Sequence, residues 1–366
     1  MDVPDIDTLA RRLGSRRRLL GGAASLAAIV GAGETAVGKH KHKRKQKVTI
    51  CQGGQTLIVP AKRVKQRLKQ GATRGACCVP RCSGCGGSDG CGGTCGCASN
   101  EICDGGECRA CDVTCTADAI ACGSALMQKL MDTTTLVICP GRYQANLVLP
   151  SATLIGAGSG DDPATSTILD GGALSRVVDL EADAKVSLRG LRITNGSTNG
   201  SGGGARVESG SLQLTNCAVA GNASTRGGGI GSSGTLRLTN TQVTSNTAFN
   251  KGGGLEIFGN GPTFITNSVI VQNKTGGGDG GGIVSELSTL TIVGTEIREN
   301  TAVGGNGGGL SITTGMVTFN AACRIIDNTS TSGGVGGIAN SSGIVNLNNA
   351  TVAGNTDPQC QNVVGC

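Results

Sequence analysis

The chain has almost no aromatic side chains: its 366 residues include no tryptophan, one tyrosine (Tyr143) and four phenylalanines. Sugar binding by ring stacking uses exposed tryptophan or tyrosine, so the composition disfavours this route. Sequence-tolerant binding of nucleic acid needs aromatic platforms for the bases, and we expect no nucleic-acid partner. Histidine is also scarce, and a metal site at His40 and His42, the only two in the chain, is the weaker interpretation of that pair.

A long apolar run is also missing. The longest candidate extends from Leu19 to about Gly33 and is too short for a confident membrane span. It follows residues 15–20, which read Ser-Arg-Arg-Arg-Leu-Leu and resemble a twin-arginine export signal. We therefore predict a signal segment over residues 1–38, with a small-residue cleavage site at 36–38. The alternatives are an uncleaved anchor, which would be the only link to a membrane, and a chance arginine cluster.

The positive charge is concentrated near the N-terminus. The formal net charge is +7, and a run of lysine, histidine and arginine occupies residues 39–47. Such a run is typical of a solvated spacer, which we assign to residues 39–50. The alternative is an arm that binds polyanions such as a wall polymer, lipid headgroups or nucleic acid.

Eighteen cysteines favour an oxidising compartment, and thirteen of them lie between Cys51 and Cys122. We predict a cysteine-rich module over residues 51–115, because so few apolar residues cannot build a core without crosslinks. Within it, Pro60 to Gln70 is predicted as a basic helix ended by Gly71. The alternative to disulfides is zinc, since two cysteine pairs have zinc-ligand spacing: Cys82 with Cys85, and Cys108 with Cys111.

Residues 51–77 look like a small cysteine-flanked motif that recurs in secreted bacterial proteins, and this resemblance implies a bridge between Cys51 and Cys77. The predicted export route raises a conflict, because twin-arginine export carries folded proteins out of a cytosol that keeps thiols reduced. Either the module oxidises after export or the route differs from the predicted one.

A six-fold repeat dominates the second half of the chain. Each copy has a glycine run, an apolar residue, alternating apolar positions and a closing asparagine, and glycine reaches 64 residues in total. A period of about two dozen residues predicts a solenoid, and the alternation predicts strands. The closing asparagines are Asn222, Asn246, Asn273, Asn300, Asn328 and Asn355. Identical amides in one column of a stack predict a hydrogen-bonded asparagine ladder.

A second column lies five residues before each asparagine and contains only small side chains: Cys217, Thr241, Ser268, Thr295, Cys323 and Ala350. Small residues in every copy predict a crowded interior position. Cys217 and Cys323 lie four coils apart, roughly 19 Å at ~4.8 Å per strand, so they cannot bridge each other.

These repeats resemble the right-handed parallel β-helix of pectin-lyase-like proteins, and their short motifs resemble those of chlamydial polymorphic outer-membrane adhesins. The resemblance covers roughly Ala117 to Thr356. It implies an all-β, right-handed parallel β-helix of about eight or nine coils over residues 116–366. Because the shared residues are structural, the resemblance implies a fold and carries no catalytic residue.

Both ends of the solenoid have predicted closing elements. Residues 116–131 read as an amphipathic helix that covers the N-terminal end, with Ile120, Met127, Leu130 and Met131 on its packed side. A disulfide from Cys139 to Cys122 or Cys115 would hold the first coil. At the other end, a disulfide between Cys360 and Cys366 would hold the last coil.

Few residues are candidates for chemistry. Glu299 and Asp327 share a column of adjacent coils and are the best carboxylate pair for a glycosidase or lyase, although exposed turn residues are the simpler interpretation. A glycine-rich turn around Asp279 resembles a calcium-binding turn but occurs only once. We therefore expect no cofactor, with calcium as the weaker alternative.

The sequence thus favours an exported, non-enzymatic structural, adhesive or polymer-binding β-helix protein. Its expected location is the cell surface or the extracellular space. We expect a monomer whose partner is a polysaccharide or another cell-wall polymer. The alternative is a carbohydrate-active lyase or hydrolase on a pectin-lyase-like fold.

Overall fold

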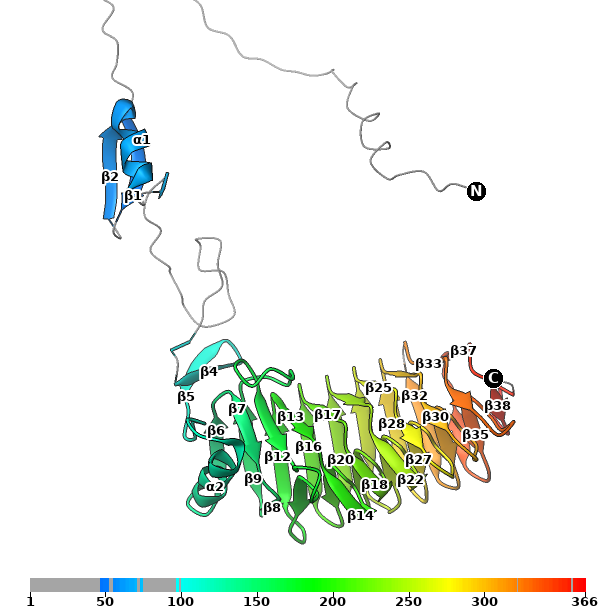
Figure 1. The fold of residues 1–366 in the computed structure, drawn as a ribbon. Helices are drawn as coiled ribbons and strands as arrows, with labels where there is room; N and C mark the ends of the chain where they lie inside the picture. Colours follow the sequence, from blue (N-terminus) through cyan, green and yellow to red (C-terminus); the bar gives the residue numbers. More distant parts are fainter. Residues whose placement is uncertain are drawn as a thin grey trace, which may run out of the picture. The chain divides into compact units, whose positions relative to one another are not determined.

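A computed structural model of the chain describes residues 47–52, 55–70, 73–74, 97–98, 100–320, 322–356 and 358–366 (Figure 1). The chain forms two compact units, residues 1–77 and 78–366, which are described separately. Among the described residues, no helix is long and apolar enough to cross a membrane.

The first unit is a small antiparallel sheet with one helix. Strand β1 (Lys47–Gln52) pairs with β2 (Gln55–Pro60) and β3 (Thr73–Arg74). The predicted basic helix is confirmed as α1 (Ala61–Lys69), which starts directly after Pro60. Its Val64 is buried and packs with Val48, Val59 and Leu68, and these four residues form an apolar cluster among the described residues of the unit.

The second unit is a parallel β-solenoid of about eight turns, built on three sheets of nine strands each. Successive coils add one strand to each sheet in turn, which Figure 1 shows as a stack running from β6 to β38. Sheet I contains β6 (Thr135–Ile138), β9 (Ala152–Gly156), β12 (Lys185–Arg189), β16 (Ser211–Thr215), β20 (Thr235–Thr239), β24 (Thr263–Thr266), β28 (Thr289–Val293), β32 (Met316–Asn320) and β36 (Ile344–Asn346).

The other two long sheets complete each coil. Sheet II contains β7 (Gly141–Gln144), β10 (Thr167–Asp170), β13 (Leu191–Thr194), β17 (Ala218–Ala220), β21 (Gln242–Thr244), β25 (Val269–Val271), β29 (Glu296–Arg298), β33 (Arg324–Ile326) and β37 (Thr351–Ala353). Sheet III contains β8 (Leu147–Leu149), β11 (Val178–Leu180), β15 (Ala205–Val207), β19 (Ile230–Ser232), β23 (Leu255–Ile257), β27 (Ile283–Ser285), β31 (Leu310–Ile312), β35 (Ile338–Asn340) and β38 (Cys360–Gln361).

A fourth sheet is shorter. In the middle coils, each of its strands follows a strand of sheet II and precedes a strand of sheet III along the chain. Sheet IV contains β14 (Ser197–Ser201), β18 (Ala223–Arg226), β22 (Thr247–Lys251), β26 (Lys274–Thr275), β30 (Thr301–Ala302) and β34 (Thr329–Ser330). The glycine runs form the corner between sheets IV and III. The first glycine of the first five runs has positive φ, for example +57° at Gly227, and a Cβ at the second, Gly228, would lie 2.3 Å from the carbonyl oxygen of Gly253. The corner therefore requires glycine for both backbone conformation and close stacking.

The core follows from the alternation of apolar residues along each strand. In sheet I, Leu212 pairs in register with Leu236, and Leu214 pairs with Leu238. All four side chains are fully buried, and they belong to one apolar cluster that extends from the first coil to the last. The predicted fold class, an all-β parallel β-helix with a short N-terminal helix, is confirmed.

The cap is the helix α2 (Ala119–Leu130), which begins at Asp118 and packs against β7 at the N-terminal end of the solenoid (Figure 1). The Asp118 carboxylate accepts hydrogen bonds from the backbone N–H groups of Ile120 and Ala121. The predicted packed face is wrong for three of its residues, because Ile120, Met127 and Met131 are 63%, 37% and 78% exposed.

The buried face of α2 instead consists of Cys122, Gly123 and Leu126. A Cβ at Gly123 would lie 1.9 Å from the carbonyl oxygen of Gln144, so this glycine lets the helix approach the first coil closely. Cys122 is held to Cys115 by a disulfide. Close approach and crosslinking thus decide which side of the helix is buried.

A hairpin of β4 (Glu101–Asp104) and β5 (Glu107–Ala110) precedes the cap and belongs to the same compact unit as the solenoid. Its Ile102 packs with Val137 and Ile155 of the first coils. The Asp104 carboxylate lies 3.0 Å from Nη2 of Arg189. Part of the predicted 51–115 module therefore packs directly on the β-helix.

The predicted disulfide from Cys139 to Cys122 or Cys115 is wrong. Cys139 bonds to Cys111, and Cys115 bonds to Cys122. The reason is a parallel β-bridge between Val113 and Ile138, which brings the flanking Cys111 and Cys139 together. A third disulfide, between Cys97 and Cys108, links the hairpin to the preceding segment.

Candidate functional site

The six predicted ladder asparagines form one buried column, with exposed fractions from 0% to 7%. Each Nδ2 group donates to the Oδ1 atom of the next asparagine at 2.9–3.0 Å. The column is closed at both ends, because Gly196 donates its backbone N–H to Asn222 Oδ1 and Gln359 Oε1 accepts from Asn355 Nδ2. The ladder uses its polar groups internally and offers none to a ligand.

In the column of small side chains, every member except Ala350 is buried and donates hydrogen bonds to backbone carbonyl groups. Thr241 donates its hydroxyl to the carbonyl oxygens of Leu214 and Thr239 at 3.3 and 3.0 Å. The thiol of Cys217 donates to the carbonyl oxygen of Leu188, and burial raises the pKa of this thiol to about 11. Because only the thiolate is a good nucleophile, Cys217 is unsuited to catalysis at neutral pH.

The two predicted catalytic candidates lie on the surface of the solenoid. Glu299 and Asp327 are both exposed, with φ of 55° and 56° at the same turn of adjacent coils. The Glu299 carboxylate contacts its neighbour Arg298 and accepts a 2.9 Å hydrogen bond from Nε2 of Gln272. Their left-handed backbone and exposure fit turn residues.

Among the carboxylates that the structure describes, Glu256 is the most buried, and the sequence did not indicate it. Its side chain is fully buried on β23, and Oε2 accepts a 2.8 Å hydrogen bond from the hydroxyl of Ser201. Nε of Arg226 lies 3.2 Å from Oε1. Burial raises the pKa of Glu256, and the contacts with Ser201 and Arg226 oppose this shift.

Ser201, Arg226 and Glu256 belong to three consecutive coils, so their contacts connect these coils. Gly231 is the register partner of Glu256 in sheet III, and a Cβ at Gly231 would lie 1.9 Å from Oγ of Ser201. The space above Gly231 is therefore filled by the contact between Glu256 and Ser201. A carboxylate with no exposed surface cannot reach a polymer substrate, so we interpret the cluster as a structural clamp. In the sequence, Gly231 at an outward position of its strand is the feature that could have indicated this clamp.

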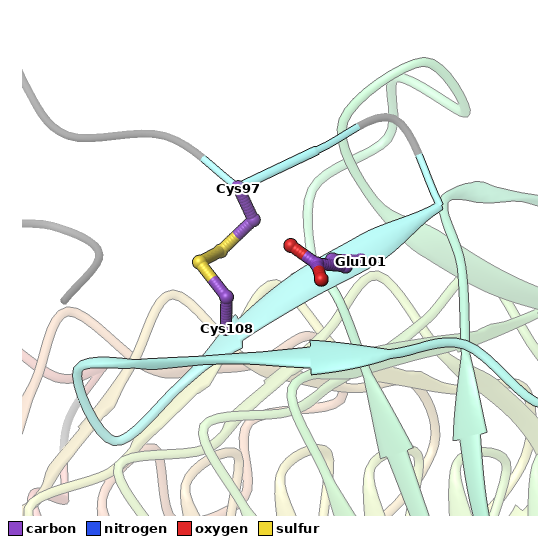
Figure 2. Close-up of side chains that lie close together, drawn as sticks. All are labelled: Cys97, Glu101 and Cys108. Atoms are coloured by element: carbon purple, nitrogen blue, oxygen red, sulfur yellow. A yellow bond between two sulfur atoms is a disulfide. The ribbon is translucent and has the colours of Figure 1, made fainter.

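A possible metal-ligand group occurs in the hairpin region. Among the described residues, Cys97, Glu101 and Cys108 are the group whose ligand atoms lie within 4.8 Å of one another. Figure 2 shows the two cysteines joined in a disulfide beside the Glu101 carboxylate. Glu101 also accepts a 3.2 Å hydrogen bond from the backbone N–H of Ala98. In this oxidised form neither sulfur is a thiolate, so the group does not offer a metal two cysteine ligands.

The remaining predicted positions have structural contacts or lie outside the description. The Asp279 carboxylate accepts a 2.6 Å hydrogen bond from the backbone N–H of Asn306. Cys360 and Cys366 form a disulfide that closes the last coil. The side chain of Cys51, and Cys77, Cys82 and Cys85, lie outside the described residues, as do residues 1–46 with the predicted signal.

Tyr143, the single tyrosine, is fully buried. Its hydroxyl donates to the carbonyl oxygen of Cys139 at 3.1 Å, and burial raises its pKa to about 12. It belongs to the core of the first coils and presents no ring to a ligand.

Comparisons with protein-family models, with curated proteins and with solved structures found no match to this chain. The proposals below therefore depend on the residues and the fold.

Proposed function

We propose that the chain is an exported, non-enzymatic β-helix protein of the cell surface or extracellular space, with a structural, adhesive or polymer-binding role. The single observation that supports it best is the internal use of its buried polar groups. The asparagine ladder, the hydroxyl column and the Glu256 clamp all stabilise the stack. The outward positions of sheet I carry mostly short polar side chains such as Thr215, Thr239 and Thr266.

The disulfides support an oxidising location. Four bonded pairs occur among the described residues, and two of them hold the cap and the first coil. Disulfides of this kind persist in extracellular proteins and are rare in the cytosol. The twin-arginine-like residues 15–20 supply a route. Replacing Arg16 and Arg17 with lysine and following the chain by cell fractionation tests export, and retention of the variant inside the cell is expected.

The binding role is tested with the full chain and a panel of acidic and neutral polysaccharides, with and without Ca²⁺. New reducing ends and unsaturated-uronide absorbance report turnover, and co-sedimentation with insoluble polymer reports binding. We expect retention without turnover. Turnover that disappears in Glu299→Gln or Asp327→Asn would instead establish the carbohydrate-active enzyme on a pectin-lyase-like fold.

A further inference from the structure

Three adjoining hollows lie beside the cap helix and the turns of the first coils. Their volumes are about 450, 240 and 540 Å³, and Asn146, between β7 and β8, lines all three. The first two also share Met127, and the last two share Leu174 and Ser175. Shared walls make them one continuous groove, which we call the cap groove.

One wall of the cap groove is apolar and exposed. Ile120 and Met127 of α2 line it together with Leu174, which is 83% exposed. These residues are three of the large hydrophobic side chains that the described surface leaves open. Exposed aliphatic groups in a hollow favour a ligand that has an apolar face to place against them.

The other wall is polar, and its side chains are available for hydrogen bonds. The hollow of about 540 Å³ is lined by Asn146, Ser175, Ser197 and Asn199. None of these side chains has a hydrogen-bond partner among the described residues. Amide side chains donate and accept at once, and hydroxyls do the same. Such groups pair well with neighbouring hydroxyls of a ligand.

The groove carries little net charge. Arg176 lines the hollow of about 540 Å³. Its guanidinium lies 2.7 Å from the Asp179 carboxylate and donates to the carbonyl oxygens of Ser201 and Gly202. Asp179 also pairs with Arg206, which pairs in turn with Glu208. These two cations are balanced by two carboxylates, and Glu181, which lines the first hollow, adds a further negative charge, so an anionic ligand gains little here.

From these observations we infer that the cap groove binds a linear neutral glycan chain. A sugar ring presents apolar C–H groups to Ile120, Met127 and Leu174, and its hydroxyls pair with Asn146, Ser197 and Asn199. This inference rests on the proposed polymer-binding role and assigns it a place and a substrate class.

The test measures binding of the full chain to neutral hexasaccharides of β-1,4-glucan, β-1,3-glucan and β-1,4-mannan, and to polygalacturonate, by titration calorimetry. We expect at least one neutral glycan to bind with little dependence on salt, because an uncharged ligand forms no ion pair with the groove. Binding restricted to polygalacturonate and abolished by salt would overturn the inference.

Variants locate the site. Asn146→Ala with Leu174→Ala should weaken glycan binding about tenfold or more, since a hydrogen bond and an apolar contact are both lost. The matched control is Asn260→Ala with Ile344→Ala, which removes an exposed asparagine and a 57% exposed apolar residue elsewhere on the solenoid. Ser197→Ala serves as a second groove variant, and equal thermal unfolding midpoints exclude a folding defect.

The outcomes separate the two proposals. If no polymer binds the unaltered chain, the binding role and the groove assignment both fail. If glycan binds the groove variants as well as the control, the binding role stands and the groove assignment alone is overturned.

Discussion

The hydroxyl of Ser201 donates a 2.8 Å hydrogen bond to the carboxylate of Glu256, which lies two coils further along the solenoid. Between them lies Gly231, where the absence of a side chain leaves room for the contact. One hydrogen bond thus links the first and the third of three consecutive coils on the outside of sheet III. Because each coil of a solenoid otherwise contacts only its neighbours, this link adds coupling over a longer range.

The first prediction concerns this space. Gly231→Ala places a Cβ 1.9 Å from Oγ of Ser201, so the clamp must open or the coils must shift. We expect a loss of roughly 1–3 kcal/mol in the free energy of unfolding, as for other overpacked sites. Urea unfolding measures it. The control is Gly277→Ala, where the nearest atom lies at an ordinary 3.7 Å, and an equal loss in both variants would contradict the clamp.

The second prediction concerns pH. Burial raises the pKa of Glu256, so the unfolded chain ionises this group at a lower pH than the folded chain does. The stability that the group contributes is therefore complete below the ordinary glutamate pKa of about 4.3 and is lost as the pH rises through the folded value. Glu256→Gln does not ionise and should not show this loss.

The measurement for Glu256 is the difference in free energy of unfolding between the wild type and Glu256→Gln, followed from about pH 4 to about pH 8. The wild type should lose stability relative to the variant as the pH rises. Taking the difference cancels the titration of the other carboxylates. A difference that stays constant would show that the contacts with Ser201 and Arg226 fully offset burial, and a change in the opposite direction would show that they outweigh it.

A third prediction follows from Thr263 on β24, which lies between Leu236 and Leu290 in a buried apolar column. Among the described residues its hydroxyl has no hydrogen-bond partner. Thr263→Val keeps the shape and removes the unsatisfied group, so we expect about 1–2 kcal/mol of added stability. Thr241→Val is the control, because it removes a hydroxyl that is hydrogen-bonded and should destabilise.

The asparagine ladder gives the fourth prediction. Asn273→Ala removes the donor to Asn300 and to the carbonyl oxygen of Val243, and leaves buried groups of Asn246 without their acceptor. We expect a loss of roughly 3–5 kcal/mol, since unsatisfied buried groups add to the lost hydrogen bonds. Asn346→Ala, at an exposed position of β36, should change stability little. If both variants lose a similar free energy of unfolding, the ladder asparagines contribute no more to stability than an exposed asparagine does.

Much of the fold could be predicted because it follows from the local periodicity of apolar residues and asparagines. The alternation of Leu212 and Leu214 specifies a strand, and the recurrence of asparagine every two dozen residues specifies a stack. The packed face of α2 could not be predicted in this way. Ile120, Met127 and Met131 are apolar and share one side, but Gly123 allows a closer approach of the other side to β7.

The candidate site was less predictable than the fold. Glu299 and Asp327 share a column, yet a shared column says nothing about depth, and both are exposed at turns. Glu256 has no acid opposite it in either adjacent coil, where its register partners are Gly231 and Val284, and its burial arises because Ser201 and Arg226 reach over it from preceding coils. The cap groove likewise combines residues of a helix and of separate coils, whose proximity no local pattern encodes.

The sequence by itself determined the solenoid, because strand alternation, glycine corners and repeated asparagines act within one coil and its neighbours. The tertiary structure alone decided which cysteine bonds to Cys139, which side of α2 is buried, how Glu256 is enclosed and where the cap groove opens. These features depend on distances between segments that are far apart in the chain. Backbone pairing such as that of Val113 with Ile138, and close packing at Gly123 and Gly231, set those distances.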